Sequence, residues 1–233
     1  GASDFHFSGE SKVADYLEKL YPGLKSPLVF DVGANNGSYA RMLSITLQAK
    51  GMQPKLFLFE PNPDLKEQIL KNTTGIEAKV ISNALSSAPG ILSLYIAASH
   101  TLSSLQNNSG LYEGMQYRQT VPVDVDTLDN FINLNEIPFV HFLKIDVEGY
   151  EFEVLRGAAN ALAQNRIGLI QFEFSRGQMI AKNYLYDFFE LLKDHYTLHR
   201  LLKDGMSAPL TWHPRWEVFQ TTNFLAIPRF MKT

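Results

Sequence analysis

The sequence predicts a doubly wound α/β fold with a mostly parallel, seven-stranded sheet and an antiparallel hairpin at one edge. Short apolar runs alternate with helical patterns from Leu28 onward, which is typical of βαβ units. The first apolar run ends in a glycine-rich turn that suits a nucleotide-type ligand. The last two runs have no helix between them, so we expect them to pair antiparallel.

Strands of the first half are expected at residues 28–30, 55–60, 78–84 and 91–97. The fourth of these runs alternates like one arm of a hairpin. Helices are expected after the first two strands, because Tyr39 to Leu47 and Leu65 to Leu70 each fit one apolar helical face. Pro61 and Pro63 separate the second strand from its helix.

The second half repeats this alternation, with strands expected at 139–145, 167–174, 197–202 and 223–227 and helices at 150–163 and 183–192. Gly205, Pro209 and Pro214 break the interval between the last two strands, so no helix is predicted there. Between the two halves, Ser99 to Gln119 is polar and has no apolar period. A loop of this length is usually functional or disordered, and we expect it to act as a lid.

Length and composition favour a single domain over residues 1–233. We divide it into an N-terminal helical segment (1–27), a ligand-binding core (28–175) and a C-terminal helix with a strand hairpin (176–233). The net charge of −3 and the absence of a Lys/Arg run argue against a nucleic-acid partner. Because the chain has no cysteine, disulfides and thiolate metal sites are excluded.

The same inspection addresses location. No stretch approaches the roughly 20 apolar residues that span a bilayer, so no membrane partner is expected. The first residues, Gly1 to Asp4, lack the charged start and apolar core of a signal peptide. A cytoplasmic location is therefore the expectation.

The turn after the first strand, from Asp31 to Gly37, is the first candidate cofactor site. Its glycines permit close backbone approach, and the following helix offers free N–H groups. The dinucleotide pattern G-x-G-x-x-G is broken at Asn35 and Ser38. The pattern D-x-G-x-G-x-G of methyltransferases is kept at Asp31, Gly33 and Gly37, and Asn35 tolerates the left-handed backbone that the middle glycine would adopt. Residues of this turn expected to bind the cofactor are Asp31, Gly33, Ala34, Asn35, Asn36 and Gly37.

Two further turns carry candidates for the same site. Glu60 ends the second strand, where a carboxylate can accept hydrogen bonds from both ribose hydroxyls, and Pro61 and Asn62 follow it. Asn83 and Ala84 follow the third strand and are candidates for contact with an adenine. For these last two residues an ordinary turn is nearly as good an explanation.

Four stretches of this sequence resemble the FkbM-type methyltransferases, which act on hydroxyl groups of sugars, polyketides and related natural products. They are VFDVGANNG at 29–37, FEPNP at 59–63, NALS at 83–86 and LKIDVEGYE at 143–151. The resemblance extends over roughly Leu28 to Ser175. It implies a Rossmann-like methyltransferase fold, S-adenosylmethionine as cofactor and O-methylation of a small-molecule or glycan hydroxyl, but it does not specify the acceptor.

Three carboxylates are the candidate catalytic residues. Asp146 and Glu148 follow the strand at 139–145, and Glu173 lies at the end of the next strand, so the three can form a cluster. Like charges this close raise at least one pKa, which produces either a base or a cation site. We expect Asp146 also to contact the cofactor, and we predict no metal, because no histidine pattern accompanies the cluster. The alternative is that Glu148 only favours a helix start and Glu173 is exposed.

Two other functions stay open from the sequence. One is a nicotinamide-dependent oxidoreductase, which the broken dinucleotide pattern disfavours. The other is a non-catalytic nucleotide-binding module of the same fold, which the acidic residues at three strand ends disfavour.

Overall fold

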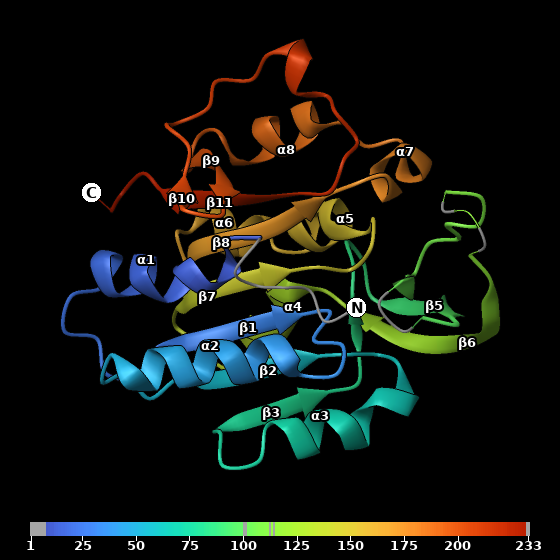
Figure 1. Ribbon diagram of the computed structural model, residues 1–233, viewed down its shortest axis with the longest axis horizontal. Helices are drawn as coiled ribbons and strands as arrows, with labels where there is room; N and C mark the ends of the chain where they lie inside the picture. The colour runs from blue at the N-terminus through green and yellow to red at the C-terminus, as the bar shows by residue number, and fades with distance from the viewer. Residues whose placement is uncertain (1–7, 100–101, 112, 114, 232–233) are drawn as a thin grey trace.

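The computed structural model describes residues 8–99, 102–111, 113 and 115–231, and a large twisted sheet lies at its centre (Figure 1). Within these residues the sheet has eight strands in the order β10-β9-β11-β8-β7-β1-β2-β3. The strands are β1 (Leu28–Val32), β2 (Lys55–Phe59), β3 (Ala78–Ile81), β7 (Val140–Ile145), β8 (Ile167–Phe174), β9 (Tyr196–Leu202), β10 (Gly205–Met206) and β11 (Thr222–Pro228).

The pairing confirms the doubly wound, mostly parallel arrangement. β1 pairs in parallel with β2 and β7, and β2 with β3 and β7 with β8 likewise. β11 is antiparallel to both β8 and β9, so the predicted antiparallel pair is present, with β11 on its inner side. The difference from the seven expected strands is β10, a two-residue strand that turns back on β9.

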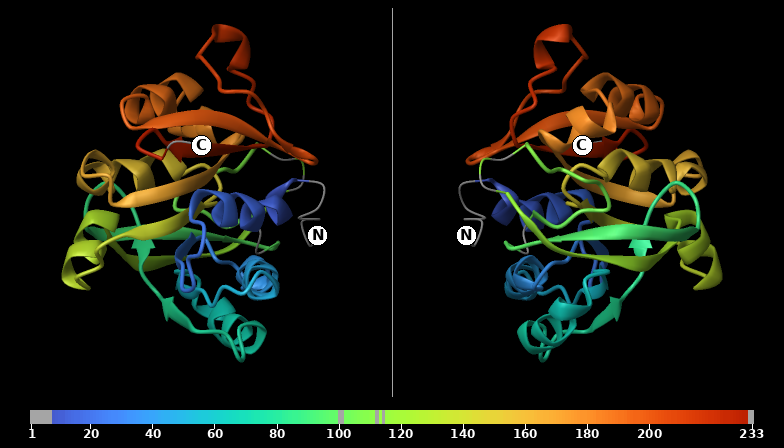
Figure 2. Two further views of the ribbon diagram at one scale, coloured as in Figure 1. Left: turned by 90° about the vertical axis from the view of Figure 1, so that its left-hand side faces the viewer. Right: turned by 90° about the vertical axis from the view of Figure 1, so that its right-hand side faces the viewer.

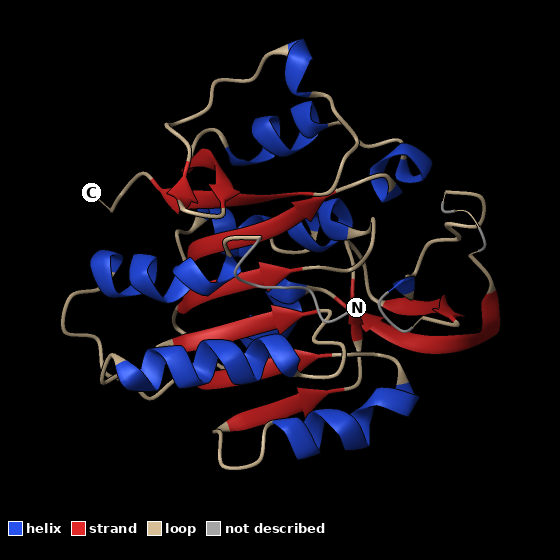
Figure 3. Cartoon of the chain, in the orientation of Figure 1, coloured by secondary structure: helices blue, strands red, loops and turns tan. Residues whose placement is uncertain are grey.

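Helices cover both faces of the large sheet, as the side views in Figure 2 and the colouring in Figure 3 show. One face packs against α1 (Val13–Leu20), α2 (Ser38–Ala49) and α3 (Lys66–Asn72), and short 3₁₀ turns at Glu10–Lys12 and Pro63–Leu65 precede α1 and α3. The other face packs against α4 (Leu128–Leu134), α5 (Glu151–Arg156), α6 (Ala159–Ala163) and α8 (Leu185–Leu192). α7 (Gly177–Ala181) follows β8, and a 3₁₀ turn lies at Pro214–Trp216. Across the described ranges, no helix has the length and apolar character needed to cross a membrane.

The helix predicted over 150–163 is two helices, α5 and α6. α5 ends just before Gly157, where the backbone of Ser86 comes very close. A Cβ atom on Gly157 would lie 2.0 Å from the backbone oxygen of Ser86, so only glycine fits at this position. The carboxylate of Asp129 then accepts the backbone N–H groups of Asn160 and Ala161, which begins α6 afresh. A cap supplied from a distant helix has no signal in the local sequence.

A separate three-stranded sheet, in the order β4-β6-β5, projects from the large one. It consists of β4 (Ala84–Leu85), β5 (Gly90–Ala97) and β6 (Tyr117–Asp126). The predicted hairpin arm at 91–97 is confirmed as β5, but its partner β6 was not predicted and shortens the loop expected at 99–119. Only Val123 and Val125 of β6 are buried, which explains its weak apolar signal. The strand expected at 78–84 is shorter than predicted. It ends at Ile81, because Ala84 belongs to β4 of this second sheet.

One aromatic cluster anchors α4 to the sheet. The ring of Phe131 makes edge contacts with Phe30, Phe57 and Phe59, at centroid distances of 5.7, 5.4 and 4.8 Å. These rings pack between α4 and the face of the sheet formed by β1 and β2.

Replacing Phe131 by alanine should therefore lower the free energy of unfolding by about 3–5 kcal/mol, because the ring leaves a cavity among three other rings. Urea denaturation measures the change. Leu134→Ala is the matched control on the same helix, since Leu134 is 79% exposed and Phe131 is 9% exposed. A loss below about 1 kcal/mol for Phe131→Ala would contradict this role.

Candidate functional site

The turn between β1 and α2 adopts the backbone that its sequence predicts. Gly33, Asn35 and Gly37 have φ values of 83°, 51° and 80°, so Asn35 does take the left-handed conformation in place of the middle glycine. A Cβ atom on Gly33 would lie 1.9 Å from the backbone oxygen of Asp146. The turn is thus pressed against the residues that follow β7, and no side chain fits at Gly33.

Glu60 ties this turn to the next one. Its Oε2 accepts the N–H of Asn35 at 2.8 Å, and its Oε1 accepts the N–H of Asn62 at 2.9 Å. Burial, with a contribution from the charge of Asp31, raises the pKa of the Glu60 carboxyl to about 7 against the effect of these two hydrogen bonds. Asn62 in turn accepts the N–H of Asp64 and caps the short helix before α3.

A pocket of about 530 Å³ opens at the carboxyl ends of β1, β2 and β7. Of the residues predicted to bind the cofactor, those that line it are Gly33, Glu60, Pro61, Ala84 and Asp146. The others lie behind or beside it, and they are Asp31, Ala34, Asn35, Asn36, Gly37, Asn62 and Asn83. Asn36, for example, accepts the N–H of Ser38 at the start of α2.

The far wall of the pocket comes from residues that the sequence did not indicate. Leu85 of β4, Leu94 of β5 and the segment from Ser103 to Leu105 complete it. These residues come from the small sheet and the segment after β5, so the prediction missed them when it missed the pairing of β5 with β6. The apolar run at 91–97 was the available signal.

Lys144 is a buried cation at the base of the site and was also missed as a functional residue. It is 3% exposed, and its Nζ lies 2.8 Å from Asp146 Oδ2 and 3.9 Å from Asp31 Oδ1. Burial alone would lower the pKa of Lys144, but the carboxylates of Asp146, Asp31 and Glu10 outweigh it and raise that pKa. Lys144 is therefore charged, and its charge faces two of the predicted site residues.

Asp31 lies beneath the glycine turn. It is 1% exposed, and neither of its side-chain oxygens has a hydrogen-bond partner in the described part of the chain. Burial raises the pKa of Asp31 to about 6, although the charge of Lys144 opposes this. A carboxylate without a hydrogen bond is costly to bury, so a positively charged group bound in the pocket in front of Asp31 would be stabilised by its charge.

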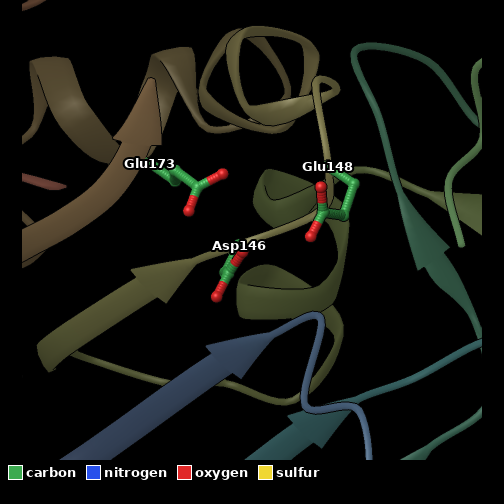
Figure 4. A group of neighbouring side chains, drawn as sticks. All are labelled: Asp146, Glu148 and Glu173. Carbon is green, nitrogen blue, oxygen red and sulfur yellow. The ribbon is translucent and has the colours of Figure 1, made fainter. Parts of the chain in front are cut away.

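The three predicted carboxylates lie together, as Figure 4 shows. Asp146 follows β7, Glu148 lies two residues later and Glu173 is on β8; one oxygen of each lies within 4.8 Å of the others. Burial and then the charges of Glu173 and Asp146 raise the pKa of Glu148 well above its usual value. Burial and then the charges of Asp146 and Glu151 do the same for Glu173. The cluster therefore holds its protons more tightly than ordinary carboxyls do, but its catalytic role stays a prediction.

Glu151 fixes the loop that presents Glu148. It is fully buried, and its carboxylate accepts the N–H of Val147 at 2.9 Å and that of Gly149 at 3.0 Å. Gln178 of α7 donates a further hydrogen bond to it. These bonds hold Glu148 at φ 57°, a conformation that non-glycine residues seldom adopt.

The segment after β5 is fixed to the same loop. Ser104 donates to the backbone oxygen of Val147 at 3.2 Å, and Asn108 donates to that of Glu148 at 2.7 Å. Gln106 reaches the backbone oxygen of Gly177 in α7 at 2.8 Å. The segment thus rests on the loop that follows β7 and on α7; its movement as a lid stays a prediction.

The site thus consists of a pocket at the carboxyl ends of β1, β2 and β7 and an acidic cluster that shares Asp146 with it, and comparison with known proteins specifies the class. The description "Methyltransferase FkbM domain" matches residues 31–198, so the chain belongs to this family of methyltransferases. The crystal structure of methyltransferase FkbM from Methylobacillus flagellatus KT shares the fold, with a TM-score of 0.51 and 17% sequence identity over 89% of this chain and 45% of that one.

Curated relatives match part of their length. Hexuronic acid methyltransferase AglP of Haloferax volcanii is 32% identical over 161 residues, which cover 66% of this chain and 58% of AglP. Methyltransferase 1 of Beauveria bassiana is 29% identical over 61% of this chain and 64% of its own. The 2-O-methyltransferase NoeI of Sinorhizobium fredii is 22% identical over 66% of this chain and 65% of its own. The matches thus span about three fifths of these relatives.

The buried carboxyl of Glu151 should make stability depend on pH. Burial raises its pKa from 4.5 to about 7, although the hydrogen bonds that it accepts oppose this. Between these values the native state holds a proton that the unfolded state has released, so the stability contributed by this group falls as the pH rises through that window. In Glu151→Gln the free energy of unfolding should therefore fall less steeply with pH than in the wild type.

Urea unfolding from pH 4.5 to about 7 measures both slopes. Glu190→Gln, the same substitution at an exposed position of α8, should keep the wild-type slope. Identical slopes for the wild type and Glu151→Gln would show that Glu151 is ionised throughout.

Proposed function

We propose that this chain transfers a methyl group from S-adenosylmethionine to a hydroxyl oxygen of a sugar or a related small molecule. The observation that carries the proposal is one pocket lined by the glycine turn, by Glu60 and by Asp146. Membership of a methyltransferase family supports methyl transfer. The relatives named for a hexuronic acid and for 2-O-methylation support a sugar hydroxyl as the acceptor.

The residues present fit S-adenosylmethionine. Its sulfonium and ammonium groups are positive, and Asp31 offers two buried oxygens without hydrogen-bond partners among the described residues. Gly33 to Gly37 would hold it by the backbone, and Glu60 would accept its ribose hydroxyls. Apolar groups at Phe59 and Leu85 would enclose the adenine. When bound, the cofactor supplies the methyl group.

The acidic cluster would take the proton of the acceptor hydroxyl. Lys144 holds Asp146 by Oδ2, whereas Oδ1 of Asp146 makes no hydrogen bond within the described ranges. We assign Oδ1 as the atom that accepts the proton while Lys144 fixes the carboxylate. Glu148 and Glu173 bind protons more tightly than ordinary carboxyls, so either of them, when ionised, would take over the proton from Asp146.

Several parts of this proposal rest on the sequence. They include one domain over residues 1–233, catalysis without a metal ion, and a partner that is neither a nucleic acid nor a membrane. The turn at 31–37 has Asn35 and Ser38 where the dinucleotide pattern requires glycines, which disfavours the oxidoreductase alternative.

Glu60→Ala should weaken S-adenosylmethionine binding by roughly 1–3 kcal/mol, because charge-assisted hydrogen bonds to the ribose would be lost. Isothermal titration calorimetry measures the affinity. Glu67→Ala, an exposed position at the start of α3, is the control and should bind as the wild type does. An unchanged affinity in Glu60→Ala would remove Glu60 from the cofactor site.

Asp146→Asn should lower kcat by about 10²–10⁴-fold while preserving cofactor affinity, because the amide keeps the shape and a hydrogen bond to Lys144 but cannot accept the proton. Single-turnover methyl transfer measured with labelled cofactor gives the rate. Loss of cofactor affinity alone would assign Asp146 to binding instead. Full activity would exclude it from the reaction, and activity that is lost with chelator and restored by Mg²⁺ would show a cation site.

A further inference from the structure

A second pocket, of about 610 Å³, lies near the opposite end of the sheet order from the cofactor pocket. It is enclosed by β9, β11 and the segment 209–221, which arches above β11 and α8 in Figure 1. Its wall includes the side chains of Arg200, Arg215, Trp216, Gln220 and Thr222. None of these residues has a part in the methyl-transfer site described above.

The two arginines of this pocket lack a counter-charge. Over the residues that the structure covers, neither guanidinium forms an ion pair or a hydrogen bond, and Nε of Arg200 is buried without a partner. Glu217, the acidic residue nearest to Arg215 in the sequence, already accepts hydrogen bonds from the N–H groups of Leu185 and Tyr186 and from the indole of Trp212, each at 2.8 Å. Two unpaired cations on one wall therefore favour an anion between them.

An aromatic ring lies beside these charges. The Arg215 guanidinium lies over the ring of Trp216 at 4.6 Å, and the indole N–H of Trp216 donates to the backbone oxygen of Thr211 at 3.2 Å. The ring is thus held in place and gives the pocket a flat apolar wall. A pyranose ring with an acidic substituent combines the two properties that such a wall and two guanidinium groups recognise.

The position of the pocket relates it to the acidic cluster. Thr222 pairs with Phe174 and Asn223 pairs with Glu173, so the pocket begins one residue along the sheet from Glu173. Because side chains alternate along a strand, Thr222 points to the other face of the sheet from Asn223. An anionic group held in this pocket stays separated from the carboxylates of Asp146, Glu148 and Glu173, which would repel it.

We propose that this pocket binds the oxyanion of an acidic sugar unit of the acceptor, a carboxylate or a phosphate, through Arg200 and Arg215, with Trp216 against the sugar ring. The acceptor role rests on the proposed function. Binding of the acidic unit itself does not, since it involves none of the residues assigned to cofactor binding or proton transfer. The two claims can therefore fail separately.

Calorimetric titration of the full chain without cofactor provides the test. The probes are methyl β-glucuronide, glucose 6-phosphate and the neutral methyl β-glucoside. We expect at least one acidic probe to bind about tenfold or more tightly than the neutral one, because hydrogen bonds between charged groups are stronger than those between neutral groups. The tighter acidic probe identifies the carboxylate or the phosphate as the group recognised. Equal affinity for all three probes would overturn the proposal.

Variants localise the binding. Arg200→Gln and Arg215→Gln should each raise the Kd of the acidic probe about tenfold or more, and Arg215→Lys should recover only part of this, because lysine lacks the planar fork. Arg156→Gln is the control, since it removes the same charge from α5, where Arg156 faces Glu153. Unchanged Kd values in both glutamine variants would overturn the assignment, and circular dichroism confirms that each variant is folded. If S-adenosylmethionine fails to bind while these effects persist, the proposed function fails and the acidic-sugar site stands.

Discussion

The buried ammonium group of Lys144 joins the carboxyl ends of the two central strands, and the geometry of the site depends on it. Lys144 pairs in register with Asp31 of β1, and its Nζ holds Asp146 beyond the end of its own strand, β7. Lys144 is 3% exposed and Asp31 is 1% exposed, so removing Lys144 would leave the Asp31 carboxylate buried without its counter-charge, a loss that typically costs about 3–5 kcal/mol. The ring of Tyr39, 4.7 Å from the ammonium group, covers it from the α2 side. The same contact that stabilises the sheet thus places Asp146 beside the glycine turn.

Backbone conformations that are rare for side-chain-bearing residues surround this ion pair, and each has an identified support. Asn35 is left-handed, and its N–H is accepted by Glu60. Glu148 is left-handed, and the loop around it is held by Glu151 and Asn108. Strain of this kind persists only where neighbouring contacts determine it. The sequence LKIDVEGYE therefore contains both the side chains that face the pocket and the one that holds their loop.

Much of the fold was predictable because the buried strands of the large sheet appear as apolar runs in the local sequence. The strand at 167–174 is found at the predicted residues, since all but one of its residues are buried and most of its side chains are large and apolar. By contrast, β6 exposes most of its side chains and takes its register from β5. The carboxylates were predictable from their places at strand ends. Lys144 was not assigned a role, because its burial between two acidic residues depends on the pairing of β1 with β7. Ser104 was missed because it reaches the pocket beside β5, in the sheet that was not predicted.

The charges of the site bear on the order of events in the proposed reaction. Asp31, Asp146, Glu148 and Glu173 face a single buried ammonium group, and mutual repulsion adds to burial in keeping carboxyls of this group protonated. A cationic ligand in the adjoining pocket relieves that repulsion, so it favours the ionised carboxylates and makes a base available. By linkage, ionisation of the cluster must then strengthen the binding of that ligand to the same extent. Loss of that positive charge from the ligand would restore the repulsion, and the cluster would again favour the protonated form. An acidic site built around one lysine thereby ties the availability of its base to the presence of a positively charged methyl donor.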